Sequence, residues 1–250
     1  MTAKRKWLTL TVAAFILLTA AIPATAAASD TQTFTDVPTS HWANAYIESV
    51  YAKKLMTGTG SGKFDPEQLV TKAEMAQTLY NVYEGRIPDN VVVVPQHFND
   101  VANDAWYRDA VYWAARTGLA NYGYRQGDST AGETGAIYTF GSSNTFSGRM
   151  TAAIYLGRLA DAMKVELPKI ADSVTFPDAE GYYLKDADGN NILSQWREVQ
   201  PYITAYIYAL QRADIIGGFP DGTFRPDEGL TRAQWAKLID LFTNLEGLQP

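Results

Sequence analysis

Apolar side chains recur with helical spacing in three parts of the chain. In the first part, positions 43, 46, 47 and 50 follow the i, i+3, i+4, i+7 spacing of one helix face. The same spacing returns 64 and 160 residues further along. The three sets are Ala43, Tyr46, Ile47 and Val50; Tyr107, Ala110, Val111 and Ala114; and Ile203, Tyr206, Ile207 and Leu210. We therefore predict three amphipathic helices, each with one buried face.

A second helix is predicted after each of these. It opens at Thr71, Ser147 and Thr231, which are residue types that cap helix N-termini. Its apolar face is Met75, Ala76, Leu79 and Val82 in the first case and Trp235, Ala236, Ile239 and Phe242 in the last. A glycine-containing turn and a Phe-x-Pro segment separate the two helices and end regular structure there. Each part of the chain is thus predicted to be a helix–loop–helix unit.

The three units form an internal repeat. Phe34, Asp36, Val37 and Trp42 return 64 residues later as Phe98, Asp100, Val101 and Trp106. We place the units at residues 29–90, 91–168 and 169–250, with insertions at about residues 125–138 and 180–198. Loops tolerate such insertions at small entropic cost, so both are expected on the outside. Because one helix pair cannot bury two apolar faces alone, the units are expected to share an all-α core with a threefold pseudo-axis.

The first 28 residues are predicted to be a secretory signal peptide. Lys4, Arg5 and Lys6 precede an apolar run from Leu8 to Ile22, and small residues at positions 24–28 suit a cleavage site. The run is short for a membrane span. Removal of this segment changes the formal charge from −6 to −9. An acidic, exported protein is expected, with no membrane contact after signal cleavage.

Composition excludes several kinds of chemistry. The chain has no cysteine and only two histidines, which excludes thiolate sites and leaves little material for a metal centre or a Ser/His/Asp triad. Its negative charge argues against nucleic acid as a partner, because phosphate contacts need a basic face. No catalytic residue, metal or cofactor is predicted.

The starts of two second helices carry an unexpected charge. Thr71–Glu74 and Thr231–Gln234 fit a capping box, which explains the first and fourth positions of each segment. Lys72 and Arg232 stand between them, where a cation opposes the positive end of the helix dipole. One interpretation is that each meets an anion, since helix N-termini also offer N–H groups to acidic ligands. The other interpretation is that each side chain is exposed to solvent and pairs with a nearby Asp or Glu carboxylate.

These motifs together resemble the S-layer homology (SLH) domain. The resemblance rests on Phe-x-Asp-Val with a following Trp, on the Gly-x-Phe-x-Pro segments at 62–66 and 222–226, and on the Thr-Lys/Arg-Ala starts at Thr71 and Thr231. It covers nearly all of the chain after the signal peptide. It implies three SLH repeats in a pseudo-trimeric spindle, with the first helices packed in a central three-helix bundle. It also implies grooves between repeats that bind secondary cell-wall polymer, typically through a pyruvylated amino sugar.

The resemblance implies a set of ligand-binding residues. Lys72 and Arg232 would contact the acidic group, Trp42 and Trp106 would line grooves, and Asp36, Asp100 and Asp178 would shape the loop. The tryptophans could instead be core anchors, and the aspartates could simply cap turns. In the second unit, glycine stands at the expected basic position and Arg149 follows one residue late, so that groove could be inactive, altered or served by Arg149 reaching across.

The implied function is non-catalytic anchoring at the cell surface. The expected location is the cell wall or S-layer, and the expected partner is an acidic secondary wall polysaccharide. A structural or interaction protein that recruits other surface proteins through the insertions is an alternative. An exported polysaccharide hydrolase is a second alternative, but the sequence offers no pair of carboxylates with defined support across a cleft.

Overall fold

The computed structural model describes residues 32–90, 95–120, 122–126, 135–141, 148–167, 176–179 and 200–250. The predicted signal peptide and the insertion predicted at about residues 180–198 lie outside these ranges. Among the described residues, no helix is both long enough and apolar enough to cross a membrane.

Six helices and one short hairpin make up the described fold, which confirms the all-α prediction. The first helices of the three units are α1 (Asn44–Ala52), α3 (Arg108–Arg116) and α5 (Gln200–Arg212). The second helices are α2 (Lys72–Tyr83), α4 (Arg149–Ala162) and α6 (Arg232–Thr243). Strands β1 (Gly123–Gln126) and β2 (Ala136–Thr139) lie between α3 and α4.

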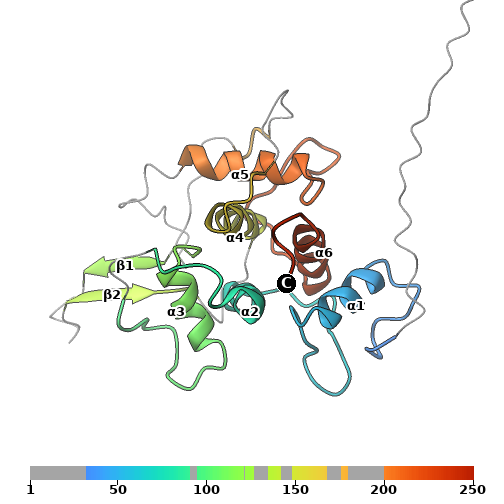
Figure 1. Ribbon diagram of the computed structural model, residues 1–250, viewed down its shortest axis with the longest axis horizontal. Coiled ribbons are helices and arrows are strands. Elements are labelled where there is room, and N and C mark those ends of the chain that lie inside the picture. The colour runs from blue at the N-terminus through green and yellow to red at the C-terminus, as the bar shows by residue number, and fades with distance from the viewer. Residues whose placement is uncertain are drawn as a thin grey trace, which may run out of the picture.

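The second helices, not the first, occupy the centre of the molecule. Figure 1 is viewed almost along the axes of α2, α4 and α6, which lie together in the middle. Helices α1, α3 and α5 lie outside them. Nine of the 14 residues of α4 and nine of the 12 of α6 are buried, whereas α1 buries only Asn44, Ile47 and Val50. A helix that is buried on most sides belongs in a core, and one with a single buried stripe belongs at its edge. The expectation that the first helices form the central three-helix bundle is therefore wrong: the second helices occupy that place.

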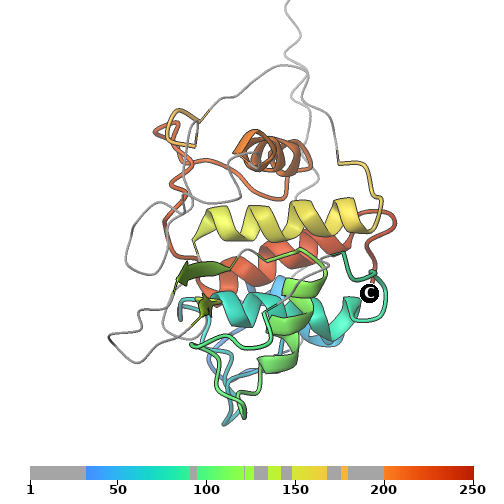
Figure 2. The ribbon, with the colours of Figure 1, turned by 90° about the vertical axis from the view of Figure 1, so that its left-hand side faces the viewer.

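Each outer helix packs on the second helix of the preceding unit. The main helix contacts are α3 with α2, α5 with α4 and α1 with α6. Figure 2 shows α4 and α6 side by side, with α5 crossing α4 on its outer side. The α1–α6 contact joins the first unit to the last, so the three units close into a ring. Lys53 and Ser49 strengthen this closure through Asp240, at 2.7 and 2.5 Å.

The second-unit insertion forms a hairpin instead of a plain loop. Strands β1 and β2 pair antiparallel, with Gly123 opposite Thr139. Ile137 is buried, and the rings of Tyr122 and Tyr138 meet at 6.0 Å between centroids. The Asn99 N–H also donates to the Tyr138 carbonyl at 2.9 Å. Apolar and aromatic contacts thus give this segment a defined structure that its Gly, Ser and Thr content did not predict; residues 127–134 lie outside the described ranges.

Gly157 sets the distance between α4 and α5. A Cβ atom at this position would overlap the ring of Tyr206. Gly→Ala within an exposed helix usually stabilises it by about 1 kcal/mol. Here we expect Gly157→Ala to lower the free energy of unfolding by about 1–3 kcal/mol, because it overpacks the contact. Denaturant titration would measure this, and the same change in a Tyr206→Ala background should be neutral or stabilising; destabilisation there too would contradict the close-packing explanation.

Candidate functional site

One aspartate in each unit holds the loop that precedes the second helix. The carboxylate accepts two successive backbone N–H groups at 2.5–2.9 Å. The pairs are Asp36 with Phe64 and Asp65, Asp100 with Phe140 and Gly141, and Asp178 with Phe224 and Arg225. The phenylalanine two residues before each aspartate packs on the loop phenylalanine, with centroids 5.3–5.8 Å apart. The three aspartates therefore occupy the same structural position, shaping the loops.

The Asp36 contact predicts an acid-dependent loss of stability. Desolvation raises the pKa of Asp36, but the hydrogen bonds from Phe64 and Asp65 outweigh it and lower the pKa overall. The contribution of this carboxylate is thus present above its unfolded pKa of about 3.9 and is lost as the pH falls through the lower folded value. We expect Asp36→Asn to cost about 1–3 kcal/mol at neutral pH and to flatten the acid limb of a plot of Tm against pH. The exposed Asp104→Asn change is the control, and an unaltered acid limb in Asp36→Asn would contradict the assignment.

Capping boxes begin α2 and α6, as the sequence predicts. At Thr71 the hydroxyl accepts the Glu74 N–H at 3.2 Å, and the Glu74 carboxylate accepts the Thr71 N–H at 2.8 Å. Thr231 and Gln234 repeat the arrangement at 3.2 and 2.9 Å. Helix α4 differs, because its N-cap is Gly148 and no side chain caps it. The predicted start at Ser147 is therefore wrong by one residue.

The start of α4 brings Arg149 into register with Lys72 and Arg232. Each of the three is the first residue of its second helix. Phe64 and Phe140 are 76 residues apart, and the same spacing counted from Lys72 reaches Gly148, which is why the sequence pattern placed glycine at the basic position. The loop before the second helix is one residue longer in the second unit, so the residue equivalent to Lys72 is 77 positions further on. The second unit thus keeps its cation, and Arg149 is the equivalent residue, not one displaced around the helix.

All three cations reach across a unit boundary to the loop phenylalanine of the next unit. Each donates to its carbonyl oxygen at 2.7–2.8 Å and lies over its ring at 4.4–4.7 Å. The pairs are Lys72 with Phe140, Arg149 with Phe224 and Arg232 with Phe64. Hydrogen bonds and cation–π contacts of this kind join unit one to two, two to three and three to one.

The N–H groups that begin α4 and α6 are already paired. Arg232 and Ala233 donate to the Gln68 and Pro66 carbonyls at 2.8 and 2.9 Å. Arg149 and Met150 donate at 3.0 Å to the corresponding carbonyls of the third-unit loop, Glu228 and Pro226. At these two helix N-termini, the N–H groups that one interpretation of the sequence assigned to an acidic ligand therefore bind the neighbouring loop instead.

Arg232 is the most engaged of the boundary cations. Its residue is 5% exposed, and it donates to the Phe64 and Thr57 carbonyls at 2.8 Å each. Its third partner is the Glu74 carboxylate at 3.3 Å. Burial lowers the pKa of Arg232, and the Glu74 charge opposes that shift. Lys72 differs in chemistry, because burial lowers its pKa to about 7 while Asp100 opposes the shift.

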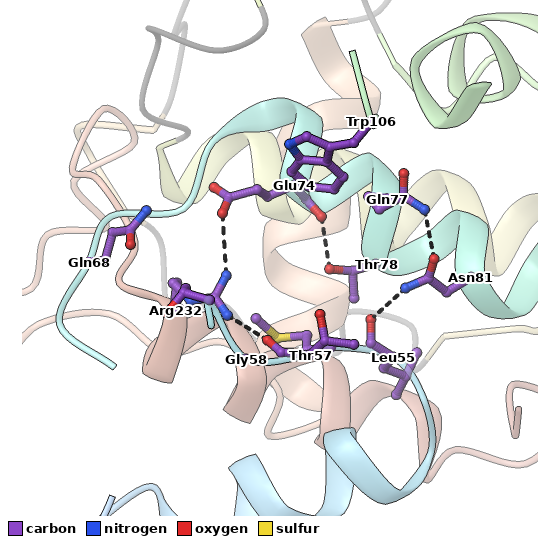
Figure 3. A pocket seen from close by; sticks show the side chains of 12 residues that line it. Leu55, Thr57, Gly58, Gln68, Glu74, Gln77, Thr78, Asn81, Trp106 and Arg232 are labelled. Carbon is purple, nitrogen blue, oxygen red and sulfur yellow. Dashed lines mark hydrogen bonds and ion pairs between the residues drawn. The ribbon is translucent and has the colours of Figure 1, made fainter. Parts of the chain in front are cut away.

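A pocket of about 410 Å³ opens where three units meet. It lies between the turn after α1, one face of α2 and Trp106, which stands two residues before α3, and Arg232 forms one wall. Figure 3 shows Trp106 beside Glu74 and Gln77, and Arg232 linked to Glu74 and to the Thr57 carbonyl. Trp106 is 67% exposed and Trp42 is 54% exposed, so neither is a core anchor. Of the predicted site residues, the pocket brings together only Trp106 and Arg232.

The pocket also contains residues that the sequence analysis missed. Glu74, Gln77 and Asn81 line it from α2. They are spaced by three and four residues, so they share a polar helix face opposite the apolar one. This polar face is the sequence feature from which they could have been predicted as site residues. Among the described residues, no group of three or more histidines and carboxylates could hold a metal ion.

The domain family is visible in two of the three units. The S-layer homology domain matches residues 33–76 and residues 196–236. These two regions are similar to SLH sequence. They include the Asp36 loop contact, both capping boxes and Arg232, but the middle unit is not matched. A comparison with curated proteins found no match.

Proposed function

We propose that this protein anchors itself to the cell wall by non-covalent binding of a secondary wall polymer. SLH domains are cell-wall anchoring modules, and the match of two units to this domain carries the proposal. The Trp106 pocket supports it, because an exposed aromatic ring beside hydrogen-bonding side chains is suited to sugars. The role is non-catalytic.

We further propose that the middle unit is a third SLH repeat. Its Phe98–Asp100–Phe140 arrangement and its boundary residue Arg149 have the geometry seen in the two matched units. An inserted hairpin and a longer loop before α4 separate its sequence from the usual spacing. The unit boundaries at residues 90/91 and 168/169 belong to this proposal.

The polymer is proposed to be acidic, with pyruvylated amino sugars, and the protein to reach it by export through the signal peptide. Lys72 and Arg149 are the boundary cations we assign to its acidic groups, with Trp42 and Trp106 lining grooves. Asp36, Asp100 and Asp178 support these sites through the loops, and Arg232 orders the Trp106 pocket. We propose that the inserted segments contact other surface proteins.

Sedimentation with purified cell walls tests the anchoring function. The parent protein should co-sediment with intact walls and stay in solution after the secondary polymer has been stripped with acid. A chaotrope should release it without digestion of peptidoglycan, because the contacts are reversible. Equal binding to stripped walls, or release only after muramidase treatment, would contradict the proposal.

A further inference from the structure

The Trp106 pocket carries no net formal charge. Its charged lining residues are Glu74 and Arg232, and they pair with each other at 3.3 Å. Their side chains are 17% and 7% exposed, so solvent screens the pair little. Two further donors of Arg232 are committed to the Phe64 and Thr57 carbonyls. An acidic group that entered here would lie beside the Glu74 carboxylate and compete with it for the guanidinium.

The neutral groups of the pocket remain available to a ligand. Gln77 donates one N–H to Asn81 Oδ1 at 2.7 Å, and Asn81 donates one to the Leu55 carbonyl at 3.2 Å. Each amide has a second N–H, and the Gln77 carbonyl oxygen is a further acceptor. With the exposed Trp106 ring, these groups suit a ring with an apolar face and uncharged hydroxyl or acetamido substituents.

The other second helices lack this set of amides. The positions equivalent to Gln77 and Asn81 are Lys237 and Leu241 on α6, which packs against the helix that follows Trp42. On α4, counted from Arg149, they are Ile154 and Arg158. The α6 side is further altered because Phe219 replaces Thr59 and lies under the Arg225 guanidinium at 3.8 Å. The amide pair therefore belongs to α2 alone among the three central helices.

We infer that the Trp106 pocket is a single site for an uncharged hexose or N-acetylhexosamine unit of the wall glycan, with Gln77 and Asn81 as specificity-determining residues. This inference rests on the proposed anchoring function and names the part of the polymer that enters the pocket. The acidic groups of the glycan then lie outside it.

Matched variants separate this pocket from its equivalent at Trp42. Affinity for purified wall polymer would be measured by calorimetry, beside a melting curve for each protein. Trp106→Ala and Gln77→Leu should each weaken binding at least tenfold. The control at the position equivalent to Gln77 on α6, Lys237→Leu, should stay within twofold of the parent. All three side chains lie at the surface or on a pocket wall, so the melting curves should overlap.

Competition identifies the charge class of the bound unit. An N-acetylhexosamine methyl glycoside should displace the polymer with an affinity within threefold of its 4,6-pyruvyl ketal. Displacement by the ketal alone, or equal losses in Gln77→Leu and Lys237→Leu, would overturn the inference while leaving anchoring intact. A parent protein that binds no wall polymer would overturn the anchoring function, and this inference with it.

Discussion

Arg232→Met is expected to lower the free energy of unfolding by about 3–5 kcal/mol, because it breaks a buried ion pair by removing one partner. The change leaves the Glu74 carboxylate and the Phe64 and Thr57 carbonyls without their donor. It also opens the contact between the third unit and the first, which closes the ring. Denaturant unfolding followed by circular dichroism would measure the loss.

Arg225→Met is the matched control. Arg225 forms ion pairs with Asp221 and Glu228 at 2.9 and 3.2 Å, but its side chain is 44% exposed. Exposed ion pairs contribute little to stability because solvent screens them, so this variant should unfold almost as the parent does. Equal stability of Arg232→Met and the parent would mean that the boundary contact is not structural. A loss of wall binding in Arg232→Met is interpretable only beside its unfolding curve.

Ile207→Asp should unfold the protein or reduce its stability by about 4 kcal/mol or more. Ile207 is fully buried on α5, whose main helix contact is with α4. A carboxylate there would lose its hydration without gaining a partner. Ile47→Asp on α1 should act in the same way, because that side chain is also fully buried. Thermal unfolding would record a lower or absent transition.

Ala205→Asp places the same charge on the exposed side of α5. It should change stability by no more than about 0.5 kcal/mol, as surface substitutions usually do. A stable Ile207→Asp protein, or an equally unstable Ala205→Asp protein, would mean that the buried face of α5 has been assigned wrongly.

The periodic pattern of the sequence was sufficient for the helices and for the unit repeat. Ile47 and Ile207 were placed on buried faces by spacing alone, and both capping boxes were predicted from four residues each. Local signals of this kind succeed because a helix face and a helix start depend on residues within one or two turns.

Which helices are central could not be derived from the amphipathic stripes. Both helices of a unit have an apolar stripe, and a stripe does not say what covers it. One sequence signal was present in α4, where Ala152 to Gly157 is apolar on every side, as a helix enclosed by neighbours should be. The resemblance to the SLH domain instead implied that the first helices are central.

The roles of the boundary cations depended on contacts between residues far apart in sequence. Spacing from Phe140 placed glycine at the basic position, because one extra loop residue before Gly148 shifts the register without leaving a mark in composition. Arg232 looked unfavourable within its own helix, since a cation there opposes the helix dipole. Its partners are 158 to 175 residues away, on the first unit. Local sequence therefore determined where the helices and their caps form, whereas the closure of the ring decided that Arg232 is buried and that Trp106, Gln77 and Asn81 share one pocket, because only packing across unit boundaries brings them together.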